Sequence, residues 1–316
     1  MKKLFFFFVL TFPISLIFSQ AEVLHYVETT GFDHNTRDVS LSMFQALGTD
    51  LQFTVVQDNN GSEFDSQQNL SRFAVVVFSN TSGANGLSES QRNNFEAYIA
   101  GGGSYLGIHA ASDTYRHSSA NGGSRGTWDW YAETVAGCSV QQSPNHTSND
   151  FNADMRLIPS NSVLDTNLPN PWNKDEEWYY WENGYLNSNF TMLLEVESTG
   201  NRSYDAARMA AHYRELSGGG RAFYTSMGHA RRNFESDANF RLLMKNAMSW
   251  MLNANTTSLD PDLLEEMNPR FVNPSTKELR FLAEIPRPMK LELELYDLSG
   301  RLVATFFISN AATGSL

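Results

Sequence analysis

The stretch Gly101-Gly-Gly-Ser-Tyr-Leu-Gly-Ile-His109-Ala-Ala-Ser-Asp113 decides the fold of this chain. Its three glycines end a preceding helix, and the apolar run 105–108 then predicts a short buried strand. His109 stands at the exit of that strand and is followed by small residues. Because ligands bind at the carboxyl ends of strands in open α/β sheets, we expect His109 and Asp113 to lie at a functional site.

Strand and helix patterns alternate on both sides of this stretch. Further strands are predicted at residues 23–27, 51–56, 73–78, 192–196, 209–213 and 222–227, and helices at 36–47, 88–101 and 237–252. The run 73–78 is almost continuously apolar, as in a central parallel strand covered on both faces. Ser88-Glu-Ser-Gln91 has the pattern of a capping box. The alternation predicts an α/β fold, a doubly wound parallel sheet with helices on both faces.

Composition and the amino-terminal sequence restrict the classes of protein to which this chain can belong. The 316 residues are 41% hydrophobic, enough for a large core, and the net charge of -12 disfavours nucleic acid as a partner. Residues 1–20 combine a basic start, an apolar run and the small residue Ser19, which predicts a secretory signal peptide, with a retained anchor as the alternative. No later segment has the length of a membrane span, so we expect no transmembrane segment in the mature protein. Cys138 is the only cysteine and is expected to be buried and inert.

The carboxyl terminus has a different character. A polar, acidic linker is expected over residues 254–269. Short apolar runs follow at 279–282, 291–295 and 302–307, with the turn sequence Asp297-Leu-Ser-Gly300 before the last of them. This pattern predicts a small antiparallel β-sandwich over residues 270–316.

Two further histidines also follow predicted strands. His34 ends the sequence Gly31-Phe-Asp-His34 after the first strand, and His229 follows the strand 222–227. Together with His109 they could surround one pocket, where His109 and His229 would transfer protons and Asp113 would orient a ring or cap a helix. Three imidazoles and a carboxylate could also bind a divalent ion such as Zn²⁺. Because neither His-x-His nor His-Glu-x-x-His occurs, we expect no metal and no cofactor, with the divalent ion as the less favoured alternative.

An acidic and aromatic patch, Lys174-Asp-Glu-Glu-Trp-Tyr-Tyr-Trp181, is the best source of carboxylates. Aromatic rings stack on the C–H faces of sugars and acids accept hydrogen bonds from their hydroxyl groups, so the patch favours a carbohydrate ligand. On a strand, Asp175 and Glu177 would share one face and Glu176 the other. We expect Glu177 to be catalytic, and the expected substrate-binding residues are His34, Trp128, Trp130, Asp175, Glu176, Trp178 and Tyr179. Core packing is the alternative for Trp128 and Trp130.

Five motifs occur in the order seen in one known family. They are Gly31-Phe-Asp-His34, the stretch 101–114, Trp128-Asp-Trp-Tyr131, Asp175-Glu-Glu-Trp-Tyr179 and the stretch 220–229. Residues 21–253 therefore resemble ThuA-like (trehalose-utilisation) domains. The resemblance implies a flavodoxin-like sheet, as in class I glutamine amidotransferases, and a link to carbohydrate metabolism.

The chain departs from those relatives at two positions. Amidotransferases place a cysteine nucleophile at the elbow where His109 stands, so glutamine hydrolysis through a thioester is not available to this protein. Relatives often show His-Pro where this chain has Ser143-Pro144, and His146 is a nearby substitute for that histidine.

The tail resembles a second family. Asn268-Pro-Arg-Phe271, Asn273-Pro274 and the stretch 295–303 are similar to the type A carboxyl-terminal sorting domain of the type IX secretion system. The usual final strand and basic end are missing, as in a truncated domain. The resemblance implies the type IX machinery as a partner, and secretion or cell-surface attachment in a Bacteroidetes-type bacterium.

The sequence thus predicts a secreted protein that acts on or binds a carbohydrate or sugar derivative at a histidine-lined site. Two alternatives stay open: a glycan-binding module without catalysis, and a structural cell-surface protein whose histidines belong to the core.

Overall fold

The computed structural model describes residues 20–123, 127–200 and 205–255, and in addition the strands between residues 270 and 315. The chain divides into two compact units, Met1–Asn255 and Thr256–Leu316. The expected signal peptide and the expected linker lie outside the described residues, except for residue 20 and residues 254–255. Among the residues described, no helix combines the length and the apolar character needed to cross a membrane.

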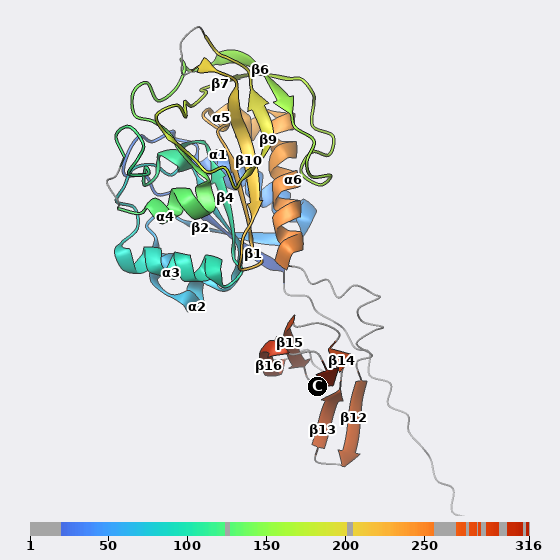
Figure 1. The fold of residues 1–316 in the computed structure, drawn as a ribbon. Helices are drawn as coiled ribbons and strands as arrows, with labels where there is room; N and C mark the ends of the chain where they lie inside the picture. Colours follow the sequence, from blue (N-terminus) through green and yellow to red (C-terminus); the bar gives the residue numbers. More distant parts are fainter. Residues whose placement is uncertain are drawn as a thin grey trace, which may run out of the picture. The chain divides into compact units, whose positions relative to one another are not determined.

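A nine-stranded sheet forms the centre of the first unit, in the order β2-β1-β3-β4-β11-β10-β9-β6-β7 (Figure 1). Its strands are β1 (Ala21–Tyr26), β2 (Phe53–Asp58), β3 (Phe73–Ser79), β4 (Ser104–Ile108), β6 (Phe151–Leu157), β7 (Trp172–Glu176), β9 (Thr191–Val196), β10 (Arg208–Glu215) and β11 (Arg221–Thr225). A separate short pair joins β5 (Cys138–Ser139) to β8 (Tyr185–Leu186).

The sheet is mixed, which corrects the expectation of a parallel sheet. β2, β1, β3, β4 and β11 run parallel to one another. β11 then pairs antiparallel with β10, and β9, β6 and β7 continue with antiparallel pairing. The expectation failed in this half because a short apolar run has the same appearance in a strand of either direction.

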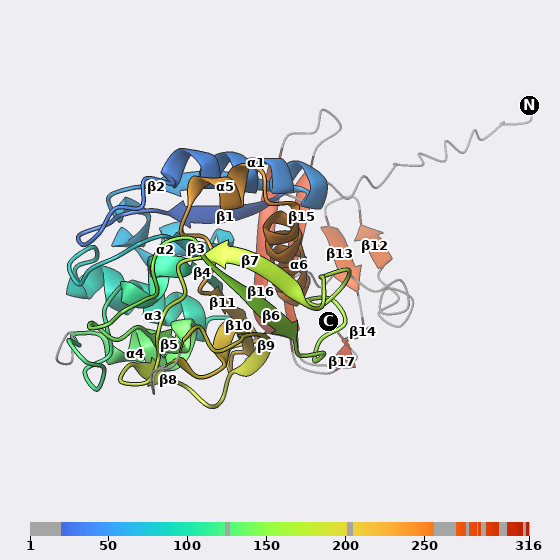
Figure 2. The ribbon, with the colours of Figure 1, turned by 90° about the horizontal axis from the view of Figure 1, so that it is seen from above.

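Helices cover both faces of the sheet, as expected. They are α1 (Arg37–Leu51), α2 (Gln67–Leu70), α3 (Glu89–Ala100), α4 (Asp129–Tyr131), α5 (Arg231–Glu235) and α6 (Ala238–Asn255), with short turns η1 (Ser62–Asp65), η2 (His109–Asp113) and η3 (Ala132–Ala136). Figures 1 and 2 show α1, α5 and α6 on one face and α2, α3 and α4 on the other. The predicted capping box starts α3, where the Ser88 hydroxyl accepts from the Gln91 amide and the Gln91 side chain accepts from the Ser88 amide.

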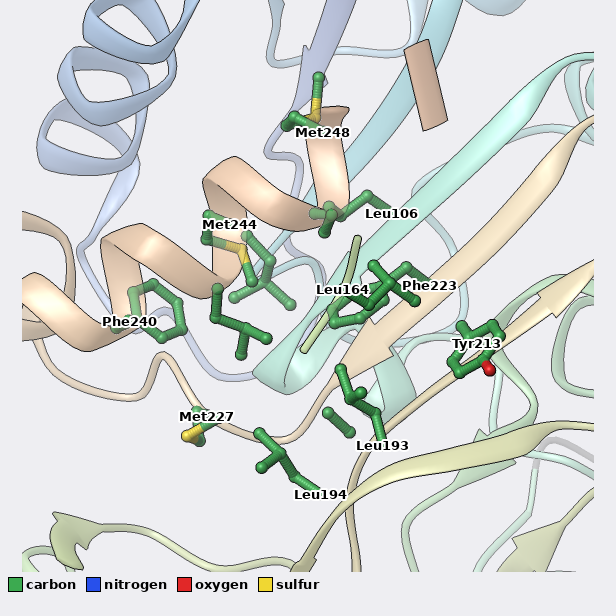
Figure 3. Close-up of a cluster of buried hydrophobic side chains, with 14 of the residues drawn as sticks. Leu106, Leu164, Leu193, Leu194, Tyr213, Phe223, Met227, Phe240, Met244 and Met248 are labelled. Atoms are coloured by element: carbon green, nitrogen blue, oxygen red, sulfur yellow. The ribbon is translucent and has the colours of Figure 1, made fainter. Parts of the chain in front are cut away.

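Two hydrophobic cores follow from the alternation of side chains along the parallel strands. β4 sends Leu106 and Ile108 into the core under α1 and α6, and Tyr105 into the core under α3. Figure 3 shows the first core, where Phe240, Met244 and Met248 of α6 face the sheet. The helical stripe predicted for residues 237–252 is therefore a core stripe.

The described residues of the second unit form three antiparallel strand pairs. β12 (Arg270–Ser275) pairs with β13 (Glu278–Leu282), β14 (Glu284–Ile285) with β17 (Gly314–Ser315), and β15 (Met289–Tyr296) with β16 (Leu302–Ala311). Short antiparallel strands agree with the sequence pattern. The sandwich arrangement and the sorting role stay predictions.

The topology brings several strand ends to one edge of the sheet. The parallel strands β1, β3, β4 and β11 all end there. From β11 to β7 the pairing is antiparallel at every step, so β7 again runs in the direction of β11. In Figure 2 the arrow of β7 points toward the edge where β3 and β4 end. The loops after these strands carry the candidate site.

Candidate functional site

Three histidines and one carboxylate meet at this edge. His34, His109, Glu177 and His229 each offer one ligand atom, and these atoms all lie within 4.8 Å of one another. The imidazoles come from the loops after β1, β4 and β11, and Glu177 directly follows β7. We call these four residues the imidazole cluster.

His109 lies in a backbone conformation that few residues other than glycine adopt. Its φ is +46°, at the abrupt turn between β4 and η2. Nδ1 of its fully buried ring lies 2.6 Å from the Ser226 carbonyl oxygen, and the ring stacks on Tyr179 at a centroid distance of 4.4 Å. Because a carbonyl oxygen only accepts, Nδ1 carries the hydrogen and Nε2 presents its lone pair to the cluster.

Gly228 allows the neighbouring loop to approach this turn. Its φ is +113°, and a Cβ atom there would come within 2.6 Å of the Ile108 Cγ2 atom. The close approach places His229 directly beside His109, with His229 Nδ1 at 3.4 Å from His109 Nε2.

Glu177 joins the imidazoles. Its Oε2 atom lies 3.2 Å from His109 Nε2 and 3.3 Å from His229 Nδ1, while Oε1 lies 3.0 Å from Nδ1 of His146. The expectation that Asp175 and Glu177 share one face was wrong, because β7 ends at Glu176 and strand alternation does not extend to Glu177. Asp175 is exposed, whereas Glu176 and Glu177 are both buried.

Glu176 acts on the backbone beside the cluster. Its carboxylate accepts hydrogen bonds from the amides of Gly228 and His229, at 3.0 and 3.2 Å, and from the Asn233 side chain at 2.6 Å. Because Glu176 is buried, these charge-assisted bonds fix the segment that carries His229.

Asn80 links the three loops that carry the imidazoles. Its side-chain amide donates to the Thr36 hydroxyl and to the Gly228 carbonyl, both at 2.9 Å, and its carbonyl accepts from the Ala110 amide at 3.2 Å. Thr36 is two residues after His34, while Ala110 and Gly228 adjoin His109 and His229. One buried side chain therefore positions the backbone of all three loops.

His34 lies against His109 and His229. Its ring is perpendicular to those of His109 and His229, at centroid distances of 4.8 and 5.1 Å, and its buried Nδ1 has no hydrogen-bond partner among the described residues. Phe32 contacts His34 edge to face at 4.9 Å and is 67% exposed, an unusual exposure for so large an apolar side chain. An exposed aromatic ring thus stands beside His34.

The charges of the cluster depend on one another. Burial opposes ionisation of Glu177, but its interactions with the imidazoles of His109 and His229 outweigh burial and hold the pKa of this carboxyl well below its usual range. Burial opposes protonation of His229, but the hydrogen bond and charge of Glu177 raise the pKa of His229. Burial, with the neighbouring imidazoles, lowers the pKa of His34 to about 2. The site therefore holds the ionised carboxylate of Glu177 beside two imidazoles of unequal basicity, His229 with a raised pKa and His34 with a lowered one.

The other candidate residues lie in different surroundings. Asp113 pairs with Arg116, and burial raises the pKa of its carboxyl. Asp175 accepts from Asn152 at the exposed edge of the sheet. Trp128 and Trp130 stack on each other near Phe95, in the core under α3.

Of the aromatic residues after Glu177, one lies in the core and one borders the cluster. Trp178 is fully buried and donates to the Phe151 carbonyl, which places it in the core. Tyr179 is also buried, but it lies against His109 and so borders the cluster. Cys138 is buried and free, and burial raises the pKa of its thiol well above the usual range.

Sequence reasoning named the four members of the cluster but missed Asn80 and Phe32. Asn80 follows the strand 73–78, so its place at a strand end was a usable signal. Phe32 lies inside the motif Gly31-Phe-Asp-His34. Its exposure depends on the fold, and nothing in the local pattern indicates it.

Comparisons with known proteins bear on the family and the fold. The family described as ThuA, trehalose utilisation, matches residues 22–251. No curated protein matches the sequence.

The solved structures that are similar in fold include the following three. A ThuA-like protein from Bacteroides uniformis is 20% identical, with a TM-score of 0.55 over 76% of this chain and 95% of that one. A ThuA-like protein from Parabacteroides merdae is 17% identical, with a TM-score of 0.53 over 76% and 92%. A cytoplasmic protein from Salmonella typhimurium is 12% identical, with a TM-score of 0.51 over 73% and 99%. At these identities the likeness concerns the fold alone.

Proposed function

Because this chain belongs to the ThuA (trehalose utilisation) family, we propose that it acts on a carbohydrate or sugar derivative at the imidazole cluster. The family supplies the sugar-related role. The convergence of His34, His109, Glu177 and His229 within 4.8 Å is the observation that carries the proposal, because it concentrates basic groups where a single small ligand can reach them.

The surroundings of the cluster fit a sugar. The exposed Phe32 ring offers a flat apolar face of the kind that sugar C–H groups stack on. His34 and His229 are partly exposed beside it, whereas His109 is fully buried. A sugar ring held on Phe32 would direct its polar oxygens toward the imidazoles and Glu177.

The chemistry we propose is activation of a hydroxyl or carbonyl oxygen of the bound sugar. The lone pair on His109 Nε2 can accept a proton, the ionised Glu177 can stabilise the imidazolium that results, and His229, whose pKa is raised, can donate a proton. These groups lie in contact, so a proton can pass among them without a large movement.

Calorimetry and a product assay, run on the same panel of trehalose, other disaccharides and their oxidised derivatives, test this proposal. We expect His109→Ala and His229→Ala to abolish turnover, while His117→Ala, outside the cluster, retains it. Binding of a glycan without product from every panel member would favour a binding module without catalysis. Wild-type turnover in both cluster variants would contradict the proposed site.

Phe32→Ala tests the sugar platform separately. We expect a loss of affinity on the order of tenfold, about 1.4 kcal/mol, with an unchanged melting temperature, because the ring is exposed. The matched control is Leu186→Ala, which removes an exposed apolar side chain from β8.

We further propose that the protein is exported, on the evidence of residues 1–20 and of the tail motifs in residues 268–303. Mass spectrometry of the protein from its native host tests this. Loss of the first 20 residues is the expected result, and a cytoplasmic chain that retains them would contradict it.

A further inference from the structure

We propose that the imidazole cluster is a binding site for one divalent first-row transition metal ion of the Zn²⁺ class. The proposal rests on the proposed function but assigns a different activator of the sugar oxygen: the ion would act in place of proton transfer by His109 and His229, which would hold it. Its test requires metal alone and no sugar, so the two proposals can fail independently.

The first argument is the orientation of lone pairs. The Ser226 carbonyl holds the hydrogen of His109 on Nδ1, so Nε2 directs a lone pair at the Glu177 carboxylate. The His229 Nδ1 atom faces the same carboxylate oxygen and also faces His109 Nε2. Without a hydrogen or a cation between them, His109 Nε2 and the ionised Glu177 oxygen are two acceptor atoms that repel each other at 3.2 Å. A single cation between the three atoms removes that conflict.

The second argument is the spacing. Zinc binds imidazole nitrogen and carboxylate oxygen at about 2.0–2.1 Å, so ligand atoms in a tetrahedral site stand roughly 3.3 Å apart. Here the three edges of the triangle formed by His109 Nε2, Glu177 Oε2 and His229 Nδ1 measure 3.2, 3.3 and 3.4 Å. An ion can therefore contact all three atoms without displacing any of them.

The fourth ligand is His34. Its ring lies across from the other two imidazoles and its ligand atom is within the 4.8 Å limit of the set. Its buried Nδ1 has no partner among the described residues, as expected of a nitrogen whose partner is an ion. From the 4.8 Å limit, a movement of about 1.5 Å would bring this atom to tetrahedral spacing.

The outer contacts match those of metal centres. Metal-ligating histidines usually donate their other N–H to a carbonyl or carboxylate, as His109 does to Ser226. The second carboxylate oxygen of Glu177 is occupied by His146, whose Nδ1 hydrogen is shared with the Thr147 carbonyl. Three imidazoles and one carboxylate suit Zn²⁺, Co²⁺ or Ni²⁺ and disfavour Mg²⁺ and Ca²⁺, which take mostly oxygen ligands.

A second histidine with nearby acids, His117 with Glu133 and Asp129, has a different arrangement. The two carboxylates contact the same Nε2 atom of His117, and its Nδ1 is bonded to Ser119. That group offers no converging set of free donor atoms. It serves instead as the control.

Metal titration of the full chain tests the inference. The protein is stripped with a chelator and titrated with Zn²⁺ in competition with a chromophoric chelator, and metal content is measured after dialysis. We expect one ion per chain. Glu177→Gln and His229→Gln should each weaken binding about 100-fold or more, whereas His117→Gln should bind as the wild type does. Circular dichroism of each variant checks that it is folded.

Substitution with Co²⁺ adds a readout that needs no variant. Tetrahedral nitrogen and oxygen ligation gives intense visible absorption, whereas octahedral surface binding gives weak bands. The expected result is intense absorption that saturates at one equivalent. Wild-type protein that binds no stoichiometric metal, or variants of the cluster that bind as tightly as the wild type, would overturn the proposal. Metal binding without any effect on sugars would leave it standing and count against the proposed function.

Discussion

Asn80→Gly tests whether one side chain positions the three loops that carry the imidazoles. The substitution removes two donated bonds and one accepted bond, all buried. At about 0.5–1.5 kcal/mol for each bond, the loss amounts to roughly 2–4 kcal/mol. Glycine is the appropriate replacement because Asn80 has a φ of +52°, where alanine would add backbone strain of about 1 kcal/mol.

Hydrogen exchange at the Ala110 amide measures the effect directly. This amide donates to the Asn80 side-chain carbonyl. Loss of the Asn80 hydrogen bonds therefore lowers the free energy of the local opening that exposes the amide, by at most the summed energy of those bonds. A loss of 2–4 kcal/mol corresponds to exchange that is faster by about 30- to 1,000-fold. The amides of residues 34–36 and 228–230 should also lose protection, because the same side chain holds both loops.

Asn246→Ala is the matched control. Its buried side-chain amide also donates twice, to the Leu164 and Thr166 carbonyls, but in α6 and away from the strand ends. We expect a comparable loss in global stability, measured by urea unfolding, with unchanged exchange at Ala110. Equal acceleration at Ala110 in both variants, or none in Asn80→Gly, would refute the idea that Asn80 positions these loops.

Three other predictions follow from buried polar groups. Glu176→Gln should lower the free energy of unfolding by about 2–3 kcal/mol in urea titrations, because a neutral amide replaces the carboxylate that accepts from Gly228, His229 and Asn233; an unchanged stability would contradict this. The pKa of His25 is lowered by burial from 6.5 to about 3, so the unfolded chain binds a proton that the folded chain does not. The free energy of unfolding should therefore fall as the pH drops from about 6.5 toward 3, by up to about 1.4 kcal/mol per pH unit. In urea titrations between pH 6 and 4, His25→Gln should show a weaker dependence of this free energy on pH than the wild type, and an equal dependence would disprove the prediction. Trp128→Phe should lower the free energy of unfolding by about 1–2 kcal/mol, because it removes the hydrogen bond from the indole N–H to Glu96. A large change in sugar binding would show instead that this residue belongs to the site.

The local pattern of the sequence was enough to predict the parallel half of the fold. Apolar runs at 73–78 and 105–108, the capping box at Ser88 and the glycines at 101–103 each act over a few residues, and all appear in the structure. The antiparallel half was not predictable in the same way. Strand direction depends on which strands pair, and pairing is decided by contacts between residues far apart in the chain.

The candidate site was likewise predictable from the sequence only in part. That histidines follow strands at 34, 109 and 229 is a property of the sequence, because parallel strands carry whatever follows them to a common edge. The contact between His109 and Glu177 spans 68 positions, and the strict alternation expected for residues 175–177 fails at Glu177, because β7 ends at Glu176. Only the tertiary structure decided that Glu177 meets the imidazoles, that Glu176 holds their backbone and that Asn80 joins the three loops. Each of these depends on a side chain crossing between elements, and local periodicity carries no information about such distances.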